Sequence, residues 1–404
     1  MSRSLAIHGE APTPTSRPPF AISAKGFRPF FALAAAYAVL FVPLWLAIIE
    51  GVARPSSYLD PLSWHAHEMI FGFTVAVIAG FLLTAVGNWT QRETLVGTPL
   101  LGLAALWVVG RVGMLASTWL PRGVPAVLDL AFLPLLAVVL ARPILATKNR
   151  RNFVMVGVLA VLSIANLGVH LAGLGVVPEG WARQSNLVAV DVIALMMLII
   201  AGRIFPMFTR NATGIATIRS HRVLDVSTIV GMVALLIGDV IAADNVFANA
   251  IAGVVGLVGA VRAVHWGARH STREPLLWIL HAGYAWLVFG LVMRGASTFI
   301  PSLPSSLPTH AITVGAIGSL TLGMMARVSL GHTGRLLAAP RAMRWAFMAI
   351  VGAAFVRVAM PLLAPAWYRG SLVISGLLWT LSFATFLVLY APILATPRLD
   401  GKPG

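Results

Sequence analysis

The sequence contains no cysteine, and this absence limits the metal chemistry open to the chain. Without thiols there are no disulfides, no thiolate zinc sites and no cysteine-ligated iron–sulfur clusters. A metal would have to be bound by histidine, methionine, carboxylate or backbone oxygen. The ten histidines are therefore the residues to follow.

Charge is also scarce. Charged residues make up 10% of the chain, against roughly 25% in soluble domains. Hydrophobic residues make up 58%, and the mean hydropathy of +0.88 is that of an integral membrane protein. The 29 Lys and Arg against 13 Asp and Glu would suggest nucleic-acid binding in a soluble chain. Because these charges lie between long apolar runs, we expect a lipid bilayer as partner and no nucleic acid.

The apolar runs predict an all-α polytopic fold. A helix needs about 20 apolar residues to cross the hydrocarbon core, and about twelve runs of this chain qualify. The expected spans are 28–50, 64–87, 97–117, 124–146, 152–175, 186–206, 223–241, 245–265, 275–297, 307–331, 343–364 and 371–394.

The connections between the spans differ in charge. We assign about 21 cations to one side and about four to the other, so the positive-inside rule places both termini in the cytoplasm of a bacterial inner membrane. We expect a disordered cytoplasmic tail at 1–26, a single transmembrane domain at 27–395 and a cytoplasmic tail at 396–404.

Similar short segments end the second, sixth and tenth spans, where small residues precede Thr and a basic residue. This spacing allows three four-helix repeats, an arrangement that would resemble the core of the haem-copper oxidases. Such a likeness concerns the fold and does not establish function.

Four histidines are expected near the extracytoplasmic face: His65, His67, His170 and His310. His65 and His67 are two residues apart, so on a helix their side chains project about 200° from each other and cannot easily share one metal. The two histidines would bind two separate metal centres, or one would be a metal ligand and the other would lie behind a ligand and orient it. The alternative is that they are interfacial residues beside Trp64.

Haem and copper suit this residue set better than other metals, because imidazole binds iron and copper and a porphyrin fits between apolar helices. Arg111, Arg294 and Arg357 lie inside the outer halves of spans and need partners there. Haem propionates would supply them. Ion pairs with Asp129, Asp191 or Asp239 are the alternative.

Other candidates are weaker. His281 lies about two turns inside the ninth span, where metal ligation and a hydrogen bond to a neighbouring helix both remain open. Met196–Met197 and Met324–Met325 are soft ligands for cuprous ion, but core packing is the simpler role for adjacent methionines. The sequence has no phosphate loop, nucleophile elbow or zinc helix, so a transporter of a small anion or metal is the alternative class.

Several segments resemble the NnrS family of membrane proteins. They are GFRPFF at 26–31, WHAHEMIFG at 64–72, AGFLLTAV at 79–86 with NWT at 88–90, GRIFPMFT at 202–209, HAITVGAIG at 310–318, and GMMARV at 323–328 with GHTGR at 331–335. The resemblance implies b-type haem, copper and a part in the response to nitric oxide in nitrosative stress and denitrification. It names no ligands, and an oxidoreductase acting on nitric oxide stays open beside simple binding.

Topology then suggests an assignment. We expect His67 and His310 as haem ligands and His65 and His170 as copper ligands, with exchange of His65 and His67 left open. Glu68, Asp191 and Trp64 would support the imidazoles or carry protons. No electron donor can be named from the sequence.

Overall fold

The computed structural model describes residues 21–54, 56–242, 245–402 and 404. Within these ranges the regular elements are helices, and twelve of the helical segments are long and apolar enough to cross a membrane. This confirms the all-α fold with about twelve spans. The predicted threefold repeat stays a prediction, and residues 1–20 of the predicted tail lie outside the described residues.

The first six spans run from α1 to α8. Their bounds are α1 (Phe27–Ile49), α2 (Pro61–His67) continued by η2 (Glu68–Thr74) and α3 (Val75–Thr90), α4 (Thr98–Leu115), α5 (Val124–Leu130) with α6 (Phe132–Ala146), η3 (Arg150–Asn152) with α7 (Phe153–Gly173), and α8 (Gly180–Thr213). A short 3₁₀ helix, η1 (Ala21–Ser23), precedes α1.

The last six spans run from α9 to α15. They are α9 (Arg222–Ile241), α10 (Val246–Val264), α11 (Pro275–Ala296), α12 (Ser306–His310) continued by η5 (Ala311–Ile317) and α13 (Gly318–Gly331), α14 (Arg341–Leu363), and η6 (Pro365–Trp367) with α15 (Tyr368–Ala395). The short helix η4 (Ala268–His270) connects α10 to α11.

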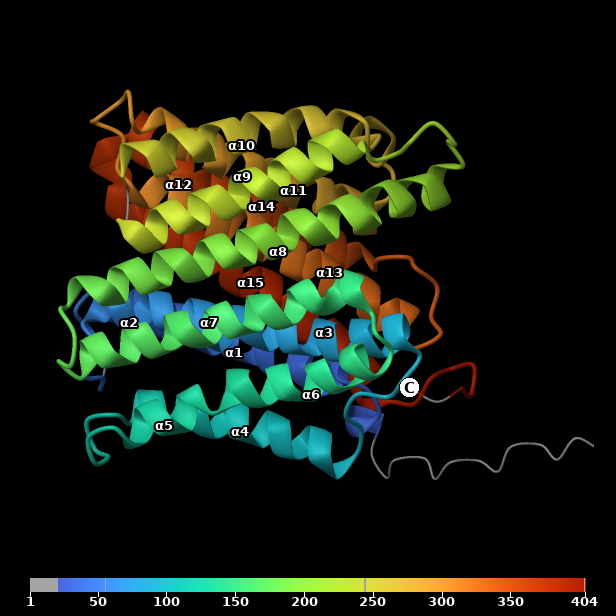
Figure 1. The fold of residues 1–404 in the computed structure, drawn as a ribbon, viewed down its shortest axis with the longest axis horizontal. Helices are drawn as coiled ribbons and strands as arrows, with labels where there is room; N and C mark the ends of the chain where they lie inside the picture. Colours follow the sequence, from blue (N-terminus) through green and yellow to red (C-terminus); the bar gives the residue numbers. More distant parts are fainter. Residues whose placement is uncertain (1–20, 55, 243–244, 403) are drawn as a thin grey trace, which may run out of the picture.

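The spans lie side by side with their axes roughly aligned (Figure 1). The hairpin of α4 with α5 and α6 is at one edge and α9 to α11 are at the other, while α8, α1 and α3 lie between them. The segment Pro61–Thr90 is the most buried of the twelve spans. Its histidines are therefore surrounded by protein on the inside of the helix array.

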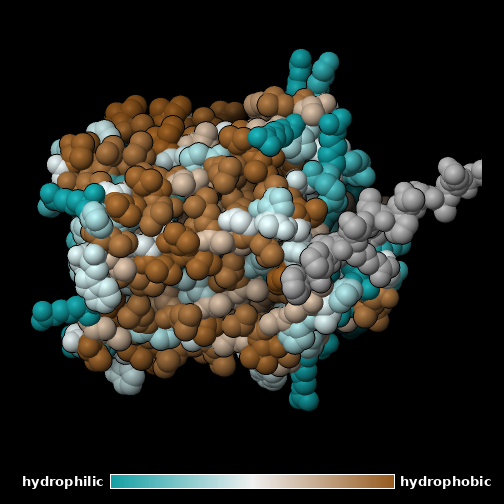
Figure 2. Space-filling model, turned by 90° about the horizontal axis from the view of Figure 1, so that it is seen from below, coloured by the Kyte–Doolittle hydropathy of each residue, from teal (hydrophilic) through white to brown (hydrophobic). Residues whose placement is uncertain are grey.

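The surface agrees with a membrane location. Figure 2 shows a broad hydrophobic band, with hydrophilic residues gathered at its two ends. The hydrophobic band includes fully lipid-accessible side chains such as Val127 and Ile164, each 68% exposed. The chain is thus a multi-pass protein by length, composition and surface.

The sixth span is longer than predicted. The sequence predicts 186–206, but α8 runs Gly180–Thr213, about 51 Å at 1.5 Å per residue. Hydropathy detects only the apolar middle of a helix, whereas the polar residues at both ends of α8 continue the backbone hydrogen bonding. Pro206, expected at a span end, is inside the helix.

Two spans change helix type next to a histidine. The second span is α-helical to His67 and then π-helical over Glu68–Thr74, and the tenth is α-helical to His310 and then π-helical over Ala311–Ile317. The Thr74 hydroxyl donates to Met69 O at 2.8 Å within the first of these segments. Such π-helical turns occur often at functional sites, and the sequence did not predict them.

Candidate metal centre

Local sequence signals position His65 and His67. Asp60 caps α2: its Oδ1 accepts hydrogen bonds from the backbone N–H groups of Leu62 and Ser63, each at 3.0 Å, and Pro61 occupies the first turn. The helix therefore begins at a defined residue, which fixes the direction of both imidazoles. They face different neighbours, as expected for residues two apart.

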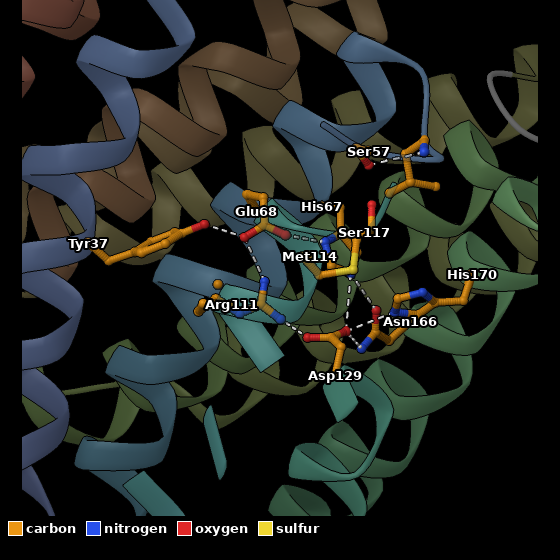
Figure 3. A network of polar contacts seen from close by, with 12 residues as sticks. Tyr37, Ser57, His67, Glu68, Arg111, Met114, Ser117, Asp129, Asn166 and His170 are labelled. Atoms are coloured by element: carbon orange, nitrogen blue, oxygen red, sulfur yellow. Dashed lines mark hydrogen bonds and ion pairs between the residues drawn. The ribbon is translucent and has the colours of Figure 1, made fainter. Parts of the chain in front are cut away.

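His67 belongs to a buried polar group that draws on four spans (Figure 3). His67 Nε2 lies 3.2 Å from Asp129 Oδ2 on α5 and 3.0 Å from Asn166 Oδ1 on α7. His170, one turn after Asn166, places its Nε2 2.8 Å from the same Asp129 Oδ2. Arg111 on α4 and Glu68, the residue after His67, complete this group, which we call the His67 centre.

The other ring nitrogen of each histidine is held separately. His67 Nδ1 lies 2.9 Å from Glu68 Oε1, and His170 Nδ1 is hydrogen-bonded to the Tyr58 hydroxyl. Tyr58 precedes the second span, and burial raises the pKa of its hydroxyl above the ordinary value, so that it stays protonated. Holding the second nitrogen orients an imidazole as metal ligands are usually oriented.

Arg111 bridges the two carboxylates of the centre. Its Nη1 donates to Glu68 Oε2 at 2.8 Å, and its Nη2 pairs with Asp129 Oδ1. Tyr37 on α1 also donates to Glu68 Oε2. The close approach of α5 to α4 that this requires occurs at Gly110, where a Cβ would lie 3.2 Å from Asp129 Cα.

When its histidines are neutral, the His67 centre has one excess negative charge, because it holds two carboxylates and only one guanidinium. None of Glu68, His67, His170, Asp129 and Arg111 is more than 4% exposed. Neutral His67 has a single N–H, yet both of its nitrogens face carboxylate oxygens. An additional cation, either a proton or a metal ion at Nε2, would remove both conflicts.

The donor atoms meet the geometry of a metal site. One ligand atom from each of His67, Asp129 and His170 lies within 4.8 Å of the others. Two imidazoles and a carboxylate, with the Asn166 oxygen beside them, form a set suited to copper, zinc or iron. A small cavity adjoins Arg111, Asp129 and Asn166, and its other walls are mainly apolar, including Phe71 and Trp107.

His65 and His310 lie in a second group, in which Arg357 is within electrostatic range of both. His65 stacks on Trp45 at a centroid distance of 4.3 Å and an interplanar angle of 13°. His310 Nδ1 donates to Ser306 O at 2.6 Å, and Arg357 Nη2 donates to His310 Nε2 at 3.3 Å. His310 is within electrostatic range of His65 as well. We call these residues the His65 group.

The remaining predicted residues lie elsewhere. Asp191 and Arg294 form a separate cluster with Asp239, in which Arg294 Nη2 donates to Asp239 Oδ1 at 2.6 Å. His281 Nε2 lies 3.0 Å from Thr209 Oγ1, which is the interhelical hydrogen bond that the sequence left open. Trp64 is buried against Phe41 at a centroid distance of 4.8 Å.

The pairing of histidines is the one that the sequence analysis left as the exchanged alternative. His67 and His170 both contact Asp129, and His65 lies in one group with His310. The preferred assignment from the sequence instead gave His67 and His310 to one cofactor, and His65 and His170 to the other. Arg111 and Arg294 each have two carboxylate partners, which corresponds to the ion-pair alternative.

Sequence reasoning missed several members of the His67 centre. Asn166, Tyr37 and Tyr58 were not predicted, and Asp129 was named only as a partner for an arginine. A signal for Asn166 exists: it is a polar residue within an apolar span, four positions before His170, and such residues share one helix face.

Comparison with known families shows to which family the chain belongs. The NnrS protein family matches residues 21–398, nearly the whole sequence. The chain belongs to the NnrS family. A search of curated proteins finds no match. Both histidine groups of this NnrS protein lie within the matched region, and the family links the chain to the nitric oxide response.

The ion pairs of the His67 centre predict a large stability effect. Replacing Arg111 by Met would leave Glu68 and Asp129 buried without their shared cation, so we expect a loss of about 3–5 kcal/mol in the free energy of unfolding. Unfolding of the detergent-solubilised protein by heat or denaturant measures this loss.

Arg122→Met is the matched control, because Arg122 is exposed in the turn before α5. We expect its unfolding free energy to change by no more than about 0.5 kcal/mol. Equal stability of the two variants would contradict the role given to Arg111.

Proposed function

We propose that this NnrS protein holds copper at the His67 centre and a b-type haem at the His65 group, and that it binds or converts nitric oxide there during nitrosative stress or denitrification. The convergence of His67 Nε2 and His170 Nε2 on one oxygen of Asp129 carries the proposal. Two imidazole nitrogens and a carboxylate oxygen directed at one point are typical of a metal site.

Copper fits the His67 centre on three counts. Imidazole and carboxylate are ligands that copper accepts, and no thiolate is available in this chain. Each imidazole has its Nδ1 held by a second group, Glu68 or Tyr58. A bound cation would also compensate the extra negative charge of the centre.

Haem fits the His65 group by its donor set. His310 donates its Nδ1 proton to a backbone carbonyl, which leaves Nε2 as the ligand atom. His65 Nδ1 is buried and has no hydrogen-bond partner among the described residues, which leaves a nitrogen of this stacked ring available to a ligand. Arg357 would pair with a propionate once it leaves His310 Nε2. A bound haem would supply an iron that binds diatomic gases and exchanges electrons.

Nitric oxide can reach such centres without a polar channel, because it is small, apolar and soluble in the bilayer. A small cavity beside Asp129 and Asn166, with space on the scale of a single water molecule, adjoins the His67 centre. Its apolar walls, such as Phe71 and Leu133, would limit water there.

The two groups predict separable losses of cofactor. We expect His65→Ala or His310→Ala to abolish or shift the Soret band while copper is retained, because these residues belong to the His65 group. His67→Ala or His170→Ala should lower bound copper while the Soret band is retained. Absorption spectra and metal analysis of the purified protein measure both.

His281→Ala is the control, since His281 bonds to Thr209 and lies in neither group. It should keep both cofactors. An unchanged haem spectrum in both His65→Ala and His310→Ala would refute the haem assignment, and full copper content in both His67→Ala and His170→Ala would refute the copper assignment.

Nitric oxide binding tests the function itself. Nitric oxide added anaerobically to the reduced protein should change the absorption and electron paramagnetic resonance spectra of the wild type, and much less those of the ligand variants. Turnover with an electron donor would assign conversion rather than binding. A colourless, metal-free preparation from haem-replete cells, with gradient-driven uptake in proteoliposomes, would instead establish the transporter alternative.

We also propose that both termini face the cytoplasm of the bacterial inner membrane. An even number of spans places both ends of the array on one face, and the connections at that face carry most of the cations. A reporter fused at the C-terminus that is active only in the cytoplasm should be active. Activity of a periplasm-specific reporter at the same position would reverse the orientation.

A further inference from the structure

A second cavity lies near the middle of the molecule, away from the His67 centre. It is partly open and is lined by residues of α1, η2 with α3, α8, and η5 with α13. Figure 1 shows the helices α3, α8 and α13 in the central part of the helix array. We call it the methionine cavity, because Met196, Met197 and Met324 line it.

The lining of the methionine cavity selects for hydrocarbon. Apart from two threonines, every residue of the lining is apolar. The Thr74 hydroxyl donates to Met69 O at 2.8 Å and the Thr321 hydroxyl donates to Ile317 O at 2.6 Å, so neither offers a free proton. Methionine side chains are flexible and adapt to an irregular apolar occupant. A polar headgroup would find no donor within these walls.

The cavity is long as well as apolar. Its lining on α8 extends from Ile193 to Phe205, which are twelve residues apart and thus roughly 18 Å along the helix axis. One leaflet of the hydrocarbon core is about 15 Å thick, half of the whole. The length therefore matches one acyl chain lying along the membrane normal.

One face of the helix array carries most of the Lys and Arg residues of the connections, and we call it the Arg-rich face. A cation without an ion-pair partner among the described residues lies beyond the end of the cavity that is nearer this face. Arg327 is one turn past Met324 on α13, and its guanidinium carbon lies 3.9 Å from the centroid of the Phe208 ring. Arg327 is half-buried. It forms no hydrogen bond or ion pair with any described residue, although Glu274 is within electrostatic range. A guanidinium with free donors is suited to a phosphate.

We propose that the methionine cavity binds one acyl chain of an anionic phospholipid from the leaflet at the Arg-rich face, with the lipid phosphate on Arg327. The apolar walls, their length and the position of the guanidinium each match one part of such a lipid. This proposal does not depend on the metal assignments. The bound chain packs against the π-helical segments η2 and η5 and supports the two spans that carry His67 and His310.

Two variants test the headgroup contact and the acyl-chain cavity separately. Arg327→Gln removes the charge, and Ile200→Trp places an indole in the cavity from a half-buried lining position. Each protein is reconstituted in vesicles of phosphatidylethanolamine and phosphatidylglycerol, extracted in mild detergent and analysed by native mass spectrometry. We expect one phosphatidylglycerol per wild-type chain and roughly tenfold lower retention in each variant, because charge-assisted contacts and apolar burial are lost.

Matched controls make the same chemical changes elsewhere. Arg341→Gln removes an exposed cation at the same face, and Ile237→Trp adds an indole on the outward side of α9. Both should retain phosphatidylglycerol as the wild type does. Equal retention in all four variants, or recovery of a quinone in place of the lipid, would overturn the proposal.

A measurement on the wild type covers the case in which a variant fails to fold. Adding phosphatidylglycerol to the delipidated wild-type protein should raise its thermal unfolding midpoint, because a ligand that binds only the folded state stabilises it. Phosphatidylethanolamine should raise the midpoint less. Equal effects of the two lipids would overturn the role of Arg327 as the headgroup partner.

Discussion

The need to compensate charge inside the bilayer organises this molecule. A lone ion in the hydrocarbon region is costly, so each buried arginine or carboxylate requires partners from neighbouring spans. Arg111 joins Glu68 and Asp129, and Arg294 joins Asp191 and Asp239, across six different spans. These bridges fix how α2, α4 and α5 approach one another, and the histidine positions follow from that approach.

The sequence predicts the spans well because hydropathy depends only on local composition. It also predicts that His65 and His67 face different surroundings, because helix periodicity sets the direction of a side chain. Neither property says which spans are neighbours. The neighbours of His67 cannot be chosen without knowing that α7 lies beside α2. The assignment of His67 and His310 to haem and of His65 and His170 to copper, or its exchange, therefore stays a prediction.

The π-helical segments escaped prediction for a related reason. Their sequences, such as Glu68–Thr74, have the composition of an ordinary apolar helix, and the extra residue per turn arises from tertiary packing. The wider turns come directly after His67 and His310. The second span thus contributes His65 and His67 to two separate groups, which holds the His67 centre and the His65 group in a fixed mutual arrangement.

The single excess negative charge of the His67 centre has a consequence for how the protein is assembled. On the proposed copper assignment, a proton or a cuprous ion would each supply the one positive charge that balances the centre, so one could replace the other without altering the charge within the membrane. The helices would then complete their packing before any metal arrives. Metallation would be an exchange at a finished site, and a chain without copper would already be a stable occupant of the membrane.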